Sequence, residues 1–249
     1  MFDAIKRWMS GNPPSPEWVE VAQWAKAQGH GFKRAREGEG FVIDGSFGNR
    51  PWRMEWGPPQ RAYISTQELR IRMELKLSSD MQMLLMSRTL MEMLERETFE
   101  RYTETTQTLI DVSTPEEMRW LAMFPKVALA LPKDLRGRFG AVGLDPQGTA
   151  SWVDSGVAQQ LLQASTGMLR DEPPFVVMTL RGRAYLRMQL GLPEPAVLTQ
   201  ALSLFNAAVQ SALRLADARR DARDARADGP STGVTAWQNQ LDDTPDSKH

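Results

Sequence analysis

The sequence predicts an α+β fold made of two duplicated modules, each a mostly antiparallel sheet followed by a long helix, in a pseudo-twofold arrangement. The first observation is a repeat: residues 70–77 are RIRMELKL and residues 185–192 are YLRMQLGL. The shared pattern recurs at one offset, 115 positions (187 − 72). Each copy alternates apolar and polar residues, as half-buried strands do. A long stretch with helical apolar spacing follows each copy, and such internal similarity favours a duplication.

The two modules set the expected domain boundaries. We expect an N-terminal arm over residues 1–14, a first module over 15–110, a second module over 111–228 packed on the first, and a disordered acidic tail over 229–249. The tail is polar and begins with turn residues, which is typical of disorder. Trp237 and Leu241 are its exceptions, suited either to docking or to simple exposure.

The first module is expected to open with a helix that has Ser15 as its N-cap and ends near Gly29. Turn residues predict hairpin turns at positions 44–45 and 48–49. Alternation of apolar and polar residues predicts strands over 41–43, 52–56, 62–64 and 69–77.

A long helix is expected over residues 79–108. Five of the fourteen methionines of the chain lie in it: Met81, Met83, Met86, Met91 and Met93. Methionine repacks easily, so this helix is either an adaptable groove for a partner or a core helix. Apolar stripes at helical spacing usually face cores, which favours the second interpretation.

The second module has the same kinds of signal. Short helices are expected over 115–123 and from Ser155 to Gly167, and a turn over 145–148. Strands are expected over 127–131, 138–144, 175–180 and 184–192. A second long helix begins beyond Pro195, and its last part, rich in Asp, Ala and Arg, is expected to be a solvated extension.

Composition excludes several classes of chemistry. The net charge is −1 and cysteine is absent, so we expect no nucleic-acid partner, no thiolate chemistry and a cytoplasmic location. Histidine occurs only at His30 and His249, so a Ser-His-Asp triad or a multi-histidine metal site cannot be built in the ordinary way. We expect no catalytic residue, metal or cofactor, and no apolar run long enough to span a membrane.

The charged face of the sheet holds the candidate ligand-binding residues. Alternation places Arg53, Arg70 and Arg72 on one side with Glu74, and Arg187 occupies the corresponding position of the second repeat. Guanidinium groups bind carboxylate and phosphate bidentately, so these residues are candidates for an anion site. Cross-strand ion pairs with Glu55, Glu68 and Glu74 are the favoured alternative, since opposite charges commonly stabilise sheets.

Two functions remain open. The first is a non-catalytic protein-binding or chaperone-like soluble protein of bacterial type, either monomer or homodimer, that uses a sheet face or helix groove. The order of helix, meander and long helix resembles small bacterial secretion chaperones, which is a likeness of element order without a shared motif. The second is a binding protein or enzyme for small anions, using the arginines and glutamates of the sheet.

Overall fold

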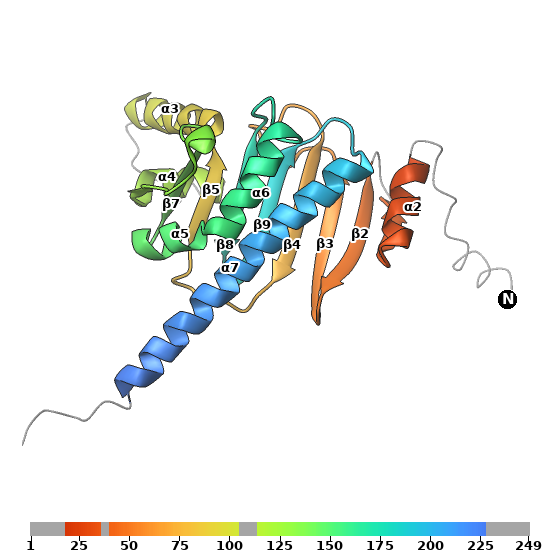
Figure 1. Ribbon diagram of the computed structural model, residues 1–249. Helices are drawn as coiled ribbons and strands as arrows, with labels where there is room; N and C mark the ends of the chain where they lie inside the picture. The colour runs from red at the N-terminus through yellow and green to blue at the C-terminus, as the bar shows by residue number, and fades with distance from the viewer. Residues whose placement is uncertain (1–17, 36–39, 105–113, 228–249) are drawn as a thin grey trace, which may run out of the picture. The chain divides into compact units, whose positions relative to one another are not determined.

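The computed structural model describes residues 18–35, 40–104 and 114–227 (Figure 1). Residues up to Ala216 belong to one compact unit, and Asp217–His249 form a second. The expected arm over 1–14 and tail over 229–249 lie outside the described residues, as do Trp237 and Leu241. The mixture of helices with one antiparallel sheet confirms the α+β class.

All nine strands of the described chain belong to one sheet, in the order β1-β2-β3-β4-β9-β8-β5-β7-β6. The strands are β1 Gly31–Arg34, β2 Phe41–Phe47, β3 Arg50–Gly57, β4 Glu68–Glu74, β5 Met83–Ser87, β6 Lys126–Val127, β7 Phe139–Gly143, β8 Phe175–Leu180 and β9 Arg183–Gln189. The helices are α2 Val19–Ala27, α3 Arg88–Glu104, α4 Glu116–Met123, α5 Pro146–Trp152, α6 Ser155–Thr166 and α7 Pro195–Ala227, with the 3-10 turn η2 Lys133–Leu135.

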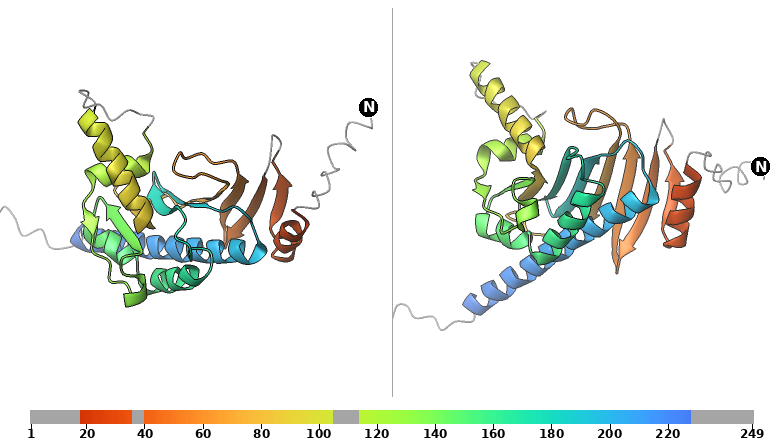
Figure 2. Two further views of the ribbon diagram at one scale, coloured as in Figure 1. Left: turned by 90° about the horizontal axis from the view of Figure 1, so that it is seen from above. Right: turned by 45° about the horizontal axis from the view of Figure 1, so that its top comes forward.

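The sheet has a separate apolar core on each face. The larger core joins the strands to α2, α5, α6 and α7, with Trp52, Ile71 and Phe205 fully buried in it. The smaller core joins β5, β7 and β8 to α3 and α4 through residues such as Leu84 and Trp120. Seen from above, α3 and α7 therefore lie on opposite sides of the sheet (Figure 2).

Helix α7 is long and apolar enough, over Pro195–Ala225, to cross a membrane by length and composition alone. Half of its most apolar window is buried inside the protein. Leu198, Phe205 and Val209 are fully buried in the larger core. The helix therefore serves as the core helix of the sheet, and core helices commonly pass such a test.

The repeated segment forms the two central strands. β4 and β9 are antiparallel neighbours, and Ile71 pairs with Leu186, the residue 115 positions later (186 − 71). Met73 and Met188, which occupy equivalent positions of the repeat, are both buried. The likeness does not extend to whole modules, because β5 follows β4 and then joins the sheet between β8 and β7. Since α3 and α7 also cover opposite faces, the structure does not confirm duplicated pseudo-twofold modules.

Several element predictions are wrong in ways that have physical causes. The expected helix over 79–108 contains strand β5, Met83–Ser87, in its first part, and only Arg88–Glu104 of it is described as helical. The expected strand over 62–64 is a loop, and the one over 127–131 shrinks to Lys126–Val127.

Two predicted turns are also wrong. Positions 44–45 continue strand β2, paired with Arg53 and Trp52 of β3, and glycine is needed at 45 because the indole of Trp52 occupies the place of a side chain. The expected turn over 145–148 opens helix α5, with the Asp145 side chain capping the Gln147 amide.

Candidate functional site

The polar face of strands β1–β4 and β9 is the first candidate site. In β4, Leu69, Ile71 and Met73 are buried against the larger core, and the residues between them face the other way. The same alternation in β3 and β9 brings together Arg53, Arg70, Arg72, Glu74 and Arg187 on one face. The predicted common direction of these side chains therefore follows from the register of three adjacent strands.

Arginines stand directly opposite one another on this face. Arg53 pairs in register with Arg72 across β3 and β4, and Arg70 pairs with Arg187 across β4 and β9. Like charges at opposed positions destabilise a sheet unless other groups screen them. Glu55 supplies part of the screening, because its carboxylate lies 3.4 Å from Arg70 Nε and 3.5 Å from Arg72 Nη2.

Glu68 screens the second arginine pair from a fully buried position. One of its carboxylate oxygens lies 2.5 Å from Arg187 Nη1. Its other oxygen accepts hydrogen bonds from the Gln60 amide at 2.6 Å and from Arg70 Nη1 at 3.3 Å. Arg70 and Arg187 are themselves only 16% and 13% exposed, so this end of the arginine face is closed to ligands.

A second buried carboxylate ties the β3–β4 loop to helix α4. Glu117 is fully buried and accepts hydrogen bonds from Arg61 Nε at 3.1 Å and from the Tyr63 hydroxyl at 3.0 Å. Burial raises the pKa of the Tyr63 hydroxyl, and the charge of Glu117 raises it further. Tyr63 therefore stays a hydrogen-bond donor at all physiological pH values. Sequence analysis did not single out Arg61, Tyr63 or Glu117, since none lies on a strand with a clear polar face.

The other end of the arginine face is open. An open hollow of about 420 Å³ lies there, which we call the arginine hollow. It is lined by Asp44, Pro51, Trp52, Arg53, Arg72, Met73, Glu74 and Arg183. Arg53 donates to Asp44 through Nε at 2.7 Å and Nη2 at 3.3 Å, and this interaction above all lowers the pKa of Asp44. Of the five predicted site residues, Arg53, Arg72 and Glu74 line the hollow, and Arg70 and Arg187 lie largely covered beside it.

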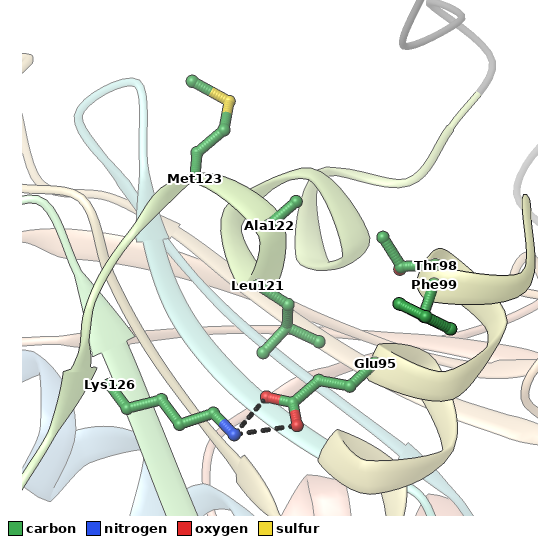
Figure 3. Close-up of a pocket in the computed structure, with 7 residues that line it drawn as sticks. All are labelled: Glu95, Thr98, Phe99, Leu121, Ala122, Met123 and Lys126. Atoms are coloured by element: carbon green, nitrogen blue, oxygen red, sulfur yellow. Dashed lines mark hydrogen bonds and ion pairs between the residues drawn. The ribbon is translucent and has the colours of Figure 1, made fainter. Parts of the chain in front are cut away.

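A different kind of hollow lies between α3 and the α4–β6 segment, and we call it the α3–α4 cleft (Figure 3). It encloses about 500 Å³ and is lined by Glu95, Thr98, Phe99, Leu121, Ala122, Met123 and Lys126. Phe99 is 69% exposed and Met123 is 63% exposed. Glu95 and Lys126 form an ion pair at 2.8 Å at one end of the cleft, below Leu121 in Figure 3. The methionine-rich stretch was predicted to be core or groove, and the structure divides it: Met91 is buried and Met93 is exposed.

The described residues contain no group of three or more His, Cys, Asp or Glu side chains placed to hold a metal ion. The ring of His30 packs edge-on against Trp52, with centroids 4.8 Å apart, and lies 6.0 Å from that of Trp24. Burial lowers the pKa of His30. Its place between two tryptophans makes it a packing residue of the α2–β1 corner.

This chain has little detectable similarity to known proteins. No protein-family model matches it, and no curated protein does. A solved structure, the crystal structure of the mycobacterial trehalose monomycolate transport factor A, TtfA, is similar with 11% identity and a TM-score of 0.46. The alignment covers 79% of this chain and 93% of that one. A likeness of that size assigns neither a family nor an activity.

Proposed function

We propose that this is a non-catalytic, chaperone-like binding protein that holds an apolar helix of a protein partner in the α3–α4 cleft. The observation that carries the proposal is the exposure of Phe99 and Met123 at the cleft's edge. Large apolar side chains gathered around a hollow mark interaction sites more often than isolated ones do.

The chemistry of the cleft favours a helical protein segment. Two helices supply most of its walls, and an amphipathic helix commonly binds by laying its apolar face into such a groove. Met123 supplies a flexible thioether side chain that adapts to the shape of different apolar groups. The Glu95–Lys126 pair supplies a polar end, which would favour one direction of the bound helix.

The arginine face suits an apolar partner less well. Its buried end is covered by the β3–β4 loop, and its arginines already pair with carboxylates. We therefore place the protein-binding function in the helix groove and not on the sheet.

Site-specific photo-crosslinking in cells tests the proposal. A photoreactive side chain at position 123 should give a discrete crosslinked protein band, which Phe99→Asp should remove. The matched control places the same side chain at position 192, since Leu192 is equally exposed at 65% but lies outside the cleft. Crosslinks of equal pattern at both positions, or no band from position 123, would refute the proposal.

Affinity measurements with the purified partner and protein then give the contribution of each residue to binding. Phe99→Ala should weaken binding about thirtyfold or more, the scale of an interface hot spot, and Leu192→Ala should leave it unchanged. If the crosslinked band is a second copy of this chain, sedimentation would show a homodimer that Phe99→Asp dissociates. That result would replace the foreign partner with self-association.

A further inference from the structure

We propose that the arginine hollow binds a small dianion, a phosphate group carried by a phosphomonoester or free as inorganic phosphate. The proposal is independent of the α3–α4 cleft, because the two hollows share no lining residue. It rests on the charge balance of the polar face, on the weak pairing of Arg72 and on the position of three arginines on adjacent strands.

The described residues of the polar face carry more cations than anions. The cations are Lys33, Arg53, Arg70, Arg72, Arg183 and Arg187, and the carboxylates are Asp44, Glu55, Glu68 and Glu74. Six positive charges against four negative ones leave an excess of two. The buried carboxylate Glu68 is shared by two arginines, so the excess is not relieved at the closed end of the face.

Sharing of carboxylates concentrates the excess around the hollow. Asp44 pairs with both Arg53 and Lys33, the latter at 3.6 Å. One carboxylate oxygen of Glu55 pairs with Arg70 and the other with Arg72. Arg72 therefore shares its carboxylate partner, whose oxygen lies 3.5 Å away. Arg72 is also 55% exposed, and its guanidinium is the least committed of those that line the hollow.

Three adjacent strands hold the donors in place. Arg53 on β3 stands opposite Arg72 on β4, and Arg183 lies on β9, the next strand of the ladder. Arg183 engages Glu74 through Nε at 2.6 Å, and a guanidinium has five N–H donors in all. The strands fix the backbone positions of the three arginines, so only their side chains have to be ordered when an anion binds. An anion between Arg53 and Arg72 would also remove their like-charge repulsion.

The size and charge of the hollow select the ligand class. About 420 Å³ accommodates a phosphate group with a small substituent. The lining itself has three arginines against Asp44 and Glu74, and the polar face around it has an excess of two positive charges, which matches the phosphate dianion better than a single carboxylate. Guanidinium forks bind phosphate oxygens bidentately, and arginine rather than lysine lines the hollow.

Isothermal titration calorimetry at low salt, with inorganic phosphate, glycerol 3-phosphate and succinate as probes, tests the inference. Phosphate and the phosphomonoester should bind, and Arg72→Gln should weaken both by about 10- to 100-fold, the range for loss of charged hydrogen bonds. Arg72→Lys should restore part of the affinity. Asp44→Asn should strengthen binding, because it frees Arg53 and removes a negative charge.

The control is Arg220→Gln, which makes the same change of charge at a 69% exposed arginine of the helical extension. It should leave phosphate affinity unchanged, and circular dichroism should show every variant folded. Failure of both phosphate probes to bind at 10 mM, or equal weakening by Arg72→Gln and Arg220→Gln, overturns the inference. Binding of succinate alone overturns the phosphate assignment. Met123→Ala, a cleft variant, should not alter phosphate binding, so the two proposals fail separately.

Discussion

The carboxylate of Glu117 shows how a single residue can hold two elements together. It is fully buried on α4, and it accepts hydrogen bonds from Arg61 and Tyr63 of the β3–β4 loop. Removing one partner of a buried pair leaves an uncompensated charge. We expect Glu117→Ala to lower the free energy of unfolding by about 3–5 kcal/mol. Urea denaturation measures the change.

Glu116→Ala is the matched control for this variant. The Glu116 side chain is 19% exposed and pairs with Arg119 and Arg181, which are 27% and 78% exposed. More exposed pairs contribute about 0–1 kcal/mol, so the neighbouring truncation should cost far less. Equal losses for the two variants would show that the buried network contributes no more than the surface one.

Gly45 tests close packing at one residue. A Cβ there would stand 2.2 Å from a ring carbon of Trp52, whereas a Cβ at Gly31 would meet nothing closer than 3.7 Å. Overpacking of this kind typically costs about 1–3 kcal/mol. We expect Gly45→Ala to lower the thermal midpoint by several degrees, since ~1 kcal/mol corresponds to ~2–4 °C in a chain of this size. Gly31→Ala should leave the midpoint within about a degree of wild type, and a shift as large as that of Gly45→Ala would contradict the packing argument.

At the scale of the element, helix α6 depends on its cap. The Asp154 side chain accepts a hydrogen bond from the Val157 amide at 2.9 Å and pairs with Arg214 at 2.6 Å. Burial raises the pKa of Asp154, but the Val157, Arg214 and Ser211 interactions outweigh it and leave the pKa below its usual value of 3.8. Asp154→Ala should therefore cost about 0.5–2 kcal/mol at neutral pH, the range for a lost N-cap.

The pH dependence of that cost has a defined sign. A carboxyl whose folded pKa is lowered stabilises fully above its unfolded pKa and loses that contribution as the pH falls through the folded value. The stability difference between wild type and Asp154→Ala should thus be constant near pH 7 and shrink below about pH 4. Asp154→Asn should keep most of the cap at both pH values, because asparagine caps nearly as well as aspartate. Urea unfolding at pH 7 and pH 3 makes the comparison, and a difference that grows in acid would contradict the assignment.

The elements also show which sequence signals suffice. β3 and β4 each have one buried face. Strict alternation in the sequence therefore predicted both strands and placed Arg53, Arg70 and Arg72 on a common side. Every residue of β5 is buried, so its apolar run lacks alternation and fits a helical stripe equally well. Asp145 and Pro146 suit a turn and a helix N-terminus alike, because both use the same side-chain hydrogen bond.

From the sequence, the candidate site could be predicted only as a group of arginines on one face of the sheet. Period-two alternation places the arginines together, but it cannot show that the β3–β4 loop folds back and covers Arg70 and Arg187. That closure depends on two hydrogen bonds. Glu68 accepts one from the Gln60 amide. Glu117, on a helix about fifty positions after the loop, accepts the other from Arg61. The α3–α4 cleft could not be predicted either, since it needs the middle of α3, Glu95 to Phe99, to lie beside α4.

At the scale of the whole molecule, the compact unit ends at Ala216 and the rest of the chain is a separate unit. The described part of that second unit, 217–227, is helical, and residues 217–225 are mostly exposed. We expect truncation after Asp228 to leave the thermal midpoint nearly unchanged, because the removed segment is polar and acidic and has few apolar residues to bury. A fall of several degrees would mean that Trp237 or Leu241 packs on the body. Differential scanning calorimetry gives the answer.

The pairing of β4 with β9 has a consequence for synthesis in the cell. The central ladder joins residues 115 positions apart, as with Ile71 and Leu186 (186 − 71). At translation rates of about 5–20 residues per second, roughly 6 to 23 s pass between the synthesis of β4 and the synthesis of β9, the strand that pairs with its edge. Throughout that interval an unpaired edge rich in apolar residues is available to other nascent chains. We expect the charges of Arg70 and Arg72 on β4 to disfavour association of the unfinished chain until β9 pairs with that edge.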